Sequence, residues 1–225
     1  MTAVFITSTG TDLGKTFVAR GMIQQLRARG RTVDALKPVI TGYDACLAHA
    51  SDSGRLLAAL GVALTPEHIA AISPYRLRDP VSPDLAARRE GVTIDFSGIV
   101  AYCRRAIGRH KDALIIEGIG GIMVPLDDNH TVLDWMIEID LPLILVTGSY
   151  VGALSHTLTA LDVLHRHGLK VAAVVVSEST ASAAGLLDTA DTIRRFARGV
   201  GVLGLPRLPE SMLDHPVMAL LADLM

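Results

Sequence analysis

Short apolar runs alternate with segments of helical periodicity along most of the chain. Runs of Val, Ile and Leu without polar alternation are typical of strands that are buried on both faces. The predicted strands are Ala3–Thr7, Val33–Lys37, Ala113–Glu117, Leu143–Thr147, Val171–Val176 and Gly201–Leu205. Strands of this kind, separated by helical crossovers, predict an α/β fold with a mostly parallel sheet and helices on both faces.

The segments between these strands carry apolar residues three or four positions apart, as amphipathic helices do. The predicted helices run from about Lys15 to Arg29 and over Ser53–Leu60, Pro66–Ala71, Pro83–Glu90, Asp95–His110 and Thr131–Ile139, with one more along the stripe Leu154, Leu158, Leu161 and Leu164. The proline-rich stretch Ser73–Pro83 predicts a long ordered loop. Because no repeat or linker interrupts the pattern, we expect a single domain over residues 1–225.

Composition narrows the functional classes. The chain has 225 residues, of which 50% are hydrophobic, and a net charge of −2, so it can bury a core and has no basic excess for nucleic acid. Its longest apolar runs, such as Leu141–Val146, reach six residues, against the ~20 of a membrane span. The first residues resemble a strand and turn rather than a signal peptide. With two cysteines, Cys46 and Cys103, we expect reduced thiols in a cytoplasmic protein.

A phosphate-binding loop is predicted between the first strand and the first helix. The segment Ser8–Thr16 ends in Gly-Lys-Thr and is a variant of the G-x-x-x-x-G-K-[ST] pattern, with Gly10 as the earlier glycine. Backbone N–H groups at a helix start attract anions. Lys15 supplies a charge for the β- and γ-phosphates, and Thr16 a hydroxyl for Mg²⁺. The loop indicates a nucleoside triphosphate.

Three further polar residues lie at the ends of predicted elements: Lys37 and Glu117 end strands, and Asp52 precedes a helix. Glu117 ends a buried strand, where a magnesium-binding carboxylate is expected, although it could be a surface acid. The glycine turn 118–121 after it lets backbone approach a ligand. Asp52, taken alone, is better explained as a helix N-cap, and Lys37, taken alone, as a solvated strand end.

Together these motifs resemble the dethiobiotin synthetase family, and the resemblance extends over essentially the whole chain. The matching segments are Thr9–Thr16, Lys37–Gly42, Ser51–Asp52, Pro74–Tyr75, Pro80–Pro83, Glu117–Gly121, Val124–Leu126 and Leu203–Pro206. The resemblance implies a P-loop NTPase-like fold and a homodimer that joins 7,8-diaminononanoate, CO₂ (or bicarbonate) and ATP. An amine is carboxylated to a carbamate, the carbamate attacks the γ-phosphate, and the second amine closes the ring and expels phosphate.

The resemblance also assigns roles to residues. Thr16, Asp52 and Glu117 resemble the magnesium ligands, and Lys37 resembles the catalytic lysine, acting beside Lys15. The substrate is expected at Thr11, Thr41 and Ser155. The nucleotide is expected at Asp12, Leu13, Gly14, Lys15, Thr16, Phe17, Asp52, Glu117, Gly118, Ile119, Gly120, Ser177, Glu178, Pro206, Arg207, Leu208 and Glu210.

Two departures from the family pattern affect these expectations. The family commonly has Asn, which contacts adenine, where this chain has Ser177. A serine makes fewer hydrogen bonds to a base edge, so we expect weaker base selectivity. The family also commonly has Asn where Ser155 stands, in the helix start Gly152–His156. That helix N-terminus is expected to receive the substrate carboxylate across the dimer interface.

Two other functions share some of these features. A partitioning or positioning ATPase shares a variant P-loop, but it often carries an extra lysine early in the loop, where this chain has Ser8 and Thr9. Such an ATPase also needs a basic patch or an amphipathic tail that binds a membrane. Residues 212–225 contain neither Lys nor Arg, so we expect them to bind anionic lipid poorly. A glutamine-dependent synthetase of the same superfamily would need a second domain, for which 225 residues leave no room.

Overall fold

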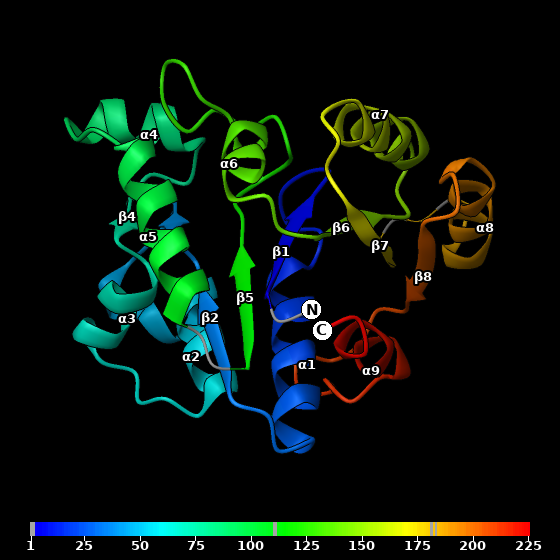
Figure 1. The fold of residues 1–225 in the computed structure, drawn as a ribbon, viewed down its shortest axis with the longest axis horizontal. Helices are drawn as coiled ribbons and strands as arrows, with labels where there is room; N and C mark the ends of the chain where they lie inside the picture. Colours follow the sequence, from blue (N-terminus) through cyan, green and yellow to red (C-terminus); the bar gives the residue numbers. More distant parts are fainter. Residues whose placement is uncertain (1–2, 110–111, 181, 183) are drawn as a thin grey trace.

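The computed structural model describes residues 3–109, 112–180, 182 and 184–225 (Figure 1). Six strands form one sheet in the order β2-β5-β1-β6-β7-β8, and each neighbouring pair is parallel. The strands are β1 (Ala3–Ser8), β2 (Val33–Leu36), β5 (Ala113–Glu117), β6 (Leu143–Gly148), β7 (Val171–Ser177) and β8 (Gly201–Leu205). Each predicted strand is therefore confirmed, with its ends placed to within one residue.

Helices connect the strands. They are α1 (Lys15–Ala28), α2 (Asp52–Leu60), α3 (Pro66–Ile72), α4 (Pro83–Glu90), α5 (Phe96–Arg109), α6 (Val132–Ile139), α7 (Ala153–Arg166), α8 (Leu186–Phe196) and α9 (Pro216–Ala222), with a 3₁₀ helix η1 (Ala45–Ala50). The helix expected to end at His110 is confirmed as far as Arg109, and His110 lies outside the described residues. None of the described helices is long and apolar enough to cross a membrane.

The proline-rich segment 73–83, which the sequence predicts to be a loop, contains a short strand. It contains β4 (Tyr75–Arg76), which pairs in parallel with β3 (Val39–Ile40) as a separate small sheet. Both strands have only two residues, too few for a hydrophobic period to mark them. The pairing is local to the segment that follows β2, and it holds Thr41 near the carboxyl end of the main sheet.

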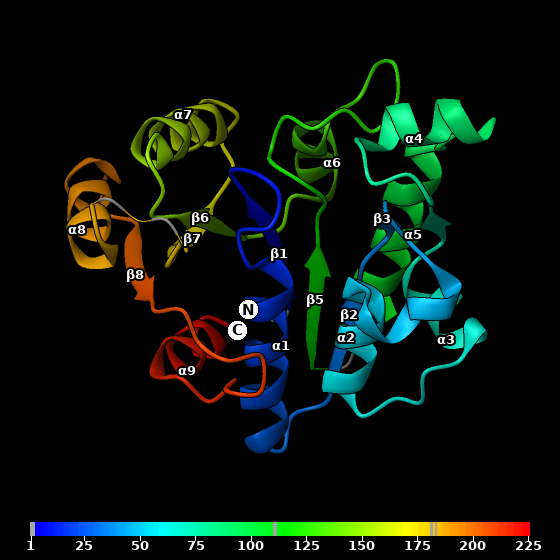
Figure 2. The same ribbon diagram turned by 180° about the vertical axis from the view of Figure 1, so that it is seen from behind.

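The connections divide the helices between the two faces of the sheet. The connection from β1 to β2 runs toward one edge, whereas those from β5 through β8 run toward the other. Because such crossovers are right-handed, α1 covers one face and α5 to α8 the opposite face. Helix α1 lies between α2 and α9 and packs against both (Figures 1 and 2). The direction in which successive connections cross the sheet thus reverses at β1. In open α/β sheets, ligands bind outside the carboxyl ends of the strands at such a point.

Candidate active site

The loop between β1 and α1 has the backbone of a phosphate-binding turn. Gly14 has φ +95°, a conformation that favours glycine, and a Cβ there would lie 3.3 Å from Ser177 Oγ. Lys15 and Thr16 begin α1, with 7% and 9% of their surface exposed. The loop therefore approaches the end of β7 closely and presents the start of a helix to a shared cavity.

Lys15 is held by the loop itself. Its Nζ donates to Ser8 Oγ at 2.9 Å and to the Gly10 carbonyl at 3.2 Å. Ser8 Oγ in turn lies 2.8 Å from the carbonyl of Gly120, which joins the phosphate loop to the glycine turn after β5. Burial, with a smaller contribution from Lys37, lowers the pKa of Lys15 to about 8. Sequence reasoning noted Ser8 only as a departure from the loop pattern and missed this contact.

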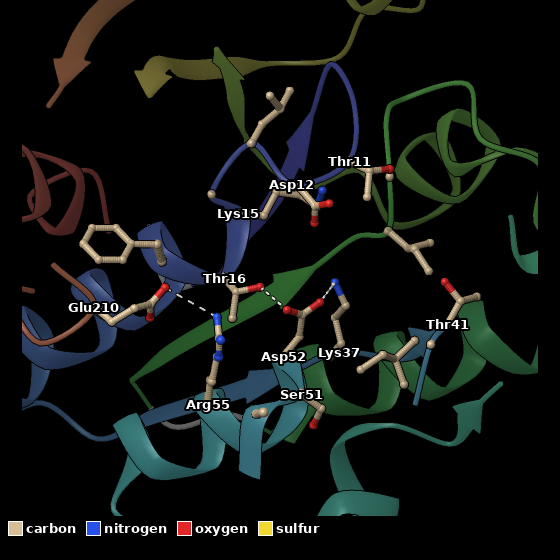
Figure 3. Close-up of a pocket in the computed structure, with 18 residues that line it drawn as sticks. Thr11, Asp12, Lys15, Thr16, Lys37, Thr41, Ser51, Asp52, Arg55 and Glu210 are labelled. Atoms are coloured by element: carbon tan, nitrogen blue, oxygen red, sulfur yellow. Dashed lines mark hydrogen bonds and ion pairs between the residues drawn. The ribbon is translucent and has the colours of Figure 1, made fainter. Parts of the chain in front are cut away.

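Four side chains meet beside this loop, those of Thr16, Lys37, Asp52 and Glu117. Figure 3 shows three of them: Thr16 of α1, Asp52 of α2, and Lys37, which directly follows β2. Thr16 Oγ1 lies 2.8 Å from Asp52 Oδ1 and 2.8 Å from Glu117 Oε1. Lys37 Nζ lies 2.6 Å from Glu117 Oε1 and 3.1 Å from Asp52 Oδ2. It also donates to the Gly118 carbonyl at 2.8 Å. One ammonium group therefore balances two carboxylates around a single hydroxyl.

Burial gives this cluster its electrostatic character. The side chains of Glu117 and Lys37 are 0% and 2% exposed, whereas that of Asp52 is 38% exposed. Burial raises the pKa of Glu117, although Lys37 opposes this. Burial also acts to lower the pKa of Lys37, but Glu117 and Asp52 outweigh it, so the pKa of Lys37 is raised. Burial acts to raise the pKa of Asp52, yet Lys37 and Thr16 bring it below the ordinary value.

The simplest interpretations of these residues, taken one by one, are wrong. Ser51, not Asp52, caps α2, because the Ser51 hydroxyl accepts a hydrogen bond from Gly54 N at 3.1 Å. The Asp52 carboxylate turns instead to Thr16 and Lys37. Lys37 is not solvated, and Glu117 is not a surface acid. Their burial depends on each other, which no local pattern records.

Two adjoining cavities contain most of the predicted site residues. The first, of about 400 Å³, is lined by Thr11–Phe17, Lys37, Ile40, Thr41, Gly42, Ala50, Ser51, Asp52, Arg55, Ile119, Gly120 and Glu210. The second, of about 320 Å³, shares part of the phosphate loop and Glu210 and adds Ser177, Glu178, Ser179, Thr180, Leu205, Pro206, Arg207 and Leu208. Arg55 was missed by sequence reasoning, because an arginine one helical turn after Asp52 carries no motif.

Three predicted residues, Glu117, Gly118 and Ser155, line neither cavity. Glu117 and Gly118 still join the site, because Lys37 contacts both of them. Ser155 stands apart. It lies exposed on the first turn of α7 and lines neither of these cavities. The neighbouring cavity beside α7 is lined by Thr11 and His156 instead. Within one chain, Ser155 is therefore not brought together with Lys37 and the phosphate loop.

The oxygen atoms of the cluster fit Mg²⁺ bound together with a nucleotide. Mg²⁺ typically takes one or two carboxylates and completes its octahedron with phosphates and water. Thr16, Asp52 and Glu117 supply two carboxylates and a hydroxyl, and Glu117 Oε2 is buried with no hydrogen-bond partner among the described residues. Among the described residues, no group of three or more His, Cys, Asp or Glu side chains is arranged to hold a metal ion.

Solved structures share the fold. The septum site-determining protein MinD, complexed with Mg-ADP, from Pyrococcus horikoshii is 18% identical with a TM-score of 0.56, covering 98% of this chain and 86% of that one. A MinC:MinD complex from Aquifex aeolicus gives 11% identity and a TM-score of 0.57, covering 99% of this chain and 88% of that one. At these identities the similarity shows a P-loop NTPase-like fold and nothing more.

Sequence relatives are much closer. A family model described as "AAA domain" matches residues 2–213. The ATP-dependent dethiobiotin synthetase of Caulobacter vibrioides is 45% identical over 208 residues, covering 92% of this chain and 93% of that one. Those of Acidiphilium cryptum (46% over 178 residues, 79% and 80% covered) and Methylobacterium nodulans (43% over 212 residues, 92% and 94% covered) are similar. With such identity over nearly its full length, the chain belongs to the dethiobiotin synthetase family.

Proposed function

We propose that the chain is an ATP-dependent ligase that converts 7,8-diaminononanoate and CO₂ to dethiobiotin in biotin biosynthesis. The observation that carries the proposal is the cluster of Lys37, Thr16, Asp52 and Glu117 beside the phosphate loop. The relatives named ATP-dependent dethiobiotin synthetase support it. A partitioning ATPase is not favoured, because the MinD structures are only 11–18% identical.

The reaction assigns a task to each cation. One substrate amine adds to CO₂ and loses a proton, which gives a carbamate. A carbamate oxygen then attacks the γ-phosphorus of ATP, and ADP leaves. The second amine attacks the carbamoyl carbon and loses a proton, and phosphate departs as the ring closes. Because carbamate and triphosphate are both anionic, their approach needs fixed positive charge. Lys15 would serve the phosphates and Lys37 the carbamate oxygen.

Thr16, Asp52 and Glu117 would hold Mg²⁺. When bound, Mg²⁺ would neutralise charge on the phosphate oxygens. The chain's own contribution is then placement, since the helix start of α1 and the two lysines orient the anions before reaction. Thr11 and Thr41, which line the same cavity, would contact the diamine.

A direct assay tests the function. Purified protein is incubated with diaminononanoate, bicarbonate, Mg²⁺ and ATP, and the product is identified by mass. Dethiobiotin that appears only with all four components supports the proposal, and hydrolysis of ATP without it would overturn the proposal. In Glu117→Gln and Asp52→Asn, the Mg²⁺ concentration for half-maximal rate should rise. The carboxylate change Glu138→Gln on α6 is the matched control, because that side chain pairs with Arg104 at the surface.

The second cavity would take the nucleoside. Ser177 and Glu178 stand at the end of β7, and Glu178 accepts a hydrogen bond from Arg207 N at 2.9 Å, which ties this edge to the segment after β8. With a serine facing the base, we expect CTP and GTP to replace ATP at a cost of about 1–2 kcal/mol, the net value of one hydrogen bond. Turnover of the three nucleotides by the wild type and Ser177→Asn tests this. Strict ATP dependence in both proteins would show that Ser177 does not set base choice.

A homodimer and a cytoplasmic location stay predictions. Ser155 is exposed at the start of α7, and a helix start favours an anion such as a partner's substrate carboxylate. The exposed Val151 and Leu154 beside it offer apolar surface to a partner chain. Light scattering at micromolar concentration tests the assembly. A fully active monomer would contradict the role of Ser155.

A further inference from the structure

Arg55 stands at the mouth of the phosphate cavity with an incomplete set of contacts. It lies on α2 one turn after Asp52 and lines the same cavity as the phosphate loop. Its side chain is 40% exposed, and its NH1 lies 3.5 Å from Glu210 Oε1. In Figure 3 this contact crosses the cavity from α2 to the segment that follows β8. An ion pair of this length and exposure is weak.

Glu210 does not depend on Arg55. Arg20 of α1, whose side chain is 16% exposed, pairs with the Glu210 carboxylate and donates to its carbonyl at 3.1 Å. Glu210 would therefore keep a cationic partner if Arg55 turned away. Arg55, by contrast, has no other ion-pair partner among the described side chains.

The remaining cations of the cavity are already engaged. Lys37 is buried against two carboxylates, and Lys15 is bonded to Ser8 and Gly10. A triphosphate brings several negative charges into this space. Arg55 is thus the cation lining this described cavity that can be released at the least cost. A guanidinium also matches phosphate oxygens with two parallel N–H donors, which an ammonium cannot do.

We propose that Arg55 is a further nucleotide-binding residue, which exchanges its contact with Glu210 for a phosphate group of the bound nucleoside triphosphate. The inference rests on the proposed function, because it takes the two cavities as the nucleotide site. It adds a phosphate contact from α2 to those supplied by the loop before α1.

A competing role for Arg55 is to hold the segment of Glu210 over the cavity. The two roles differ in what they do to ligands without phosphate. A phosphate contact contributes nothing to adenosine and contributes increasingly to ligands that place a phosphate near Arg55. A structural role would weaken adenosine and ATP alike.

Calorimetric titration with adenosine, AMP, ADP and a non-hydrolysable ATP analogue tests the proposal on wild type and Arg55→Gln. We expect the substitution to weaken at least one phosphorylated ligand by about ten-fold or more, the scale of one charged hydrogen bond, and to leave adenosine unchanged. Arg55→Lys keeps the charge without the forked donors, so its affinity for that ligand should lie between those of the wild type and Arg55→Gln. Arg104→Gln, which removes an exposed arginine on α5, is the control and should bind like the wild type.

Equal weakening of all four ligands, or no weakening in Arg55→Gln, would overturn the inference. Thermal unfolding of each variant checks that the chain is folded. If Arg55→Gln does not fold, Arg55→Lys still tests the proposal. If the wild type itself binds no ATP analogue, the nucleotide site and the proposed function fail with it. If it binds and the variants match it, only the role of Arg55 fails.

Discussion

Removing the charge of Lys37 should destabilise the protein in a manner that depends on pH. Lys37→Gln leaves the Glu117 carboxylate, which is 0% exposed, without the ammonium group 2.6 Å away. Losing one partner of a buried ion pair typically costs about 3–5 kcal/mol. The variant can lower this cost by protonating Glu117, whose pKa burial already raises.

The free-energy cost of protonating Glu117 depends on pH. Protonating a carboxyl group of ordinary pKa ~4.3 costs about 1.4 kcal/mol per pH unit above that value. The cost is therefore about 2 kcal/mol at pH 6 and about 5 kcal/mol at pH 8. In the variant, the pKa of Glu117 lies above its value in the unfolded chain, so its contribution to stability is present at low pH and is lost as pH rises. The destabilisation should thus be smaller at pH 6 than at pH 8.

Unfolding by heat or urea between pH 6 and pH 8 measures this. At ~2–4 °C per kcal/mol for a chain of this size, the melting temperature at pH 8 should fall by roughly 10–20 °C. Lys37→Gln/Glu117→Gln should recover much of the loss at pH 8, because no buried charge is left there. Nucleotide binding should persist in Lys37→Gln while ring closure falls by ~10²-fold or more, the effect of losing one charge donor in the transition state.

The matched control is an ion pair at the surface. Arg104 and Glu138 join α5 to α6 at 2.8 Å, and their side chains are 58% and 48% exposed. Arg104→Gln should cost at most ~1 kcal/mol with little change from pH 6 to pH 8. If Lys37→Gln costs no more than this at either pH, the reasoning from a desolvated pair is refuted.

Three further experiments test the phosphate loop and the burial of Cys103. Lys15→Ala should reduce turnover by orders of magnitude with little change in melting temperature, and equal activity would remove the phosphate-loop assignment. A maleimide should label one thiol in the native protein, the exposed Cys46, and a second only in denaturant, because Cys103 is buried and burial raises its pKa to about 12; two fast thiols would contradict its burial. Gly14→Ala should cost about 1–3 kcal/mol and weaken ATP binding, because its φ is +95°; Ser177→Ala should not rescue it, and calorimetry with thermal unfolding measures both effects.

The sheet could be predicted from the sequence because its signals are local. Buried parallel strands are continuous apolar runs, and the phosphate loop is contiguous, so each could be recognised within a few residues. Where two adjacent residues could serve the same role, local patterns failed: Ser51 and Asp52 are both good N-caps, and the structure uses Ser51. The contact of Arg20 with Glu210 joins residues 190 positions apart, and no pattern within either segment indicates it.

The burial of Lys37 depends on strand order and register, which no local sequence pattern carries. Strand β2 pairs with β5 so that Leu36 stands opposite Ile116. Lys37 directly follows β2, and it therefore lies beside Glu117, the last residue of β5. Strand β1 pairs on the other side with Ile6 opposite Glu117, which brings the phosphate loop to the same level. A shift of one residue in either pairing would turn Glu117 to the other face relative to its neighbours and break the cluster. The ion pair is therefore a consequence of strand order and register, which depend on the assembly of the whole sheet, while the sequence displays only the chemistry at each strand end.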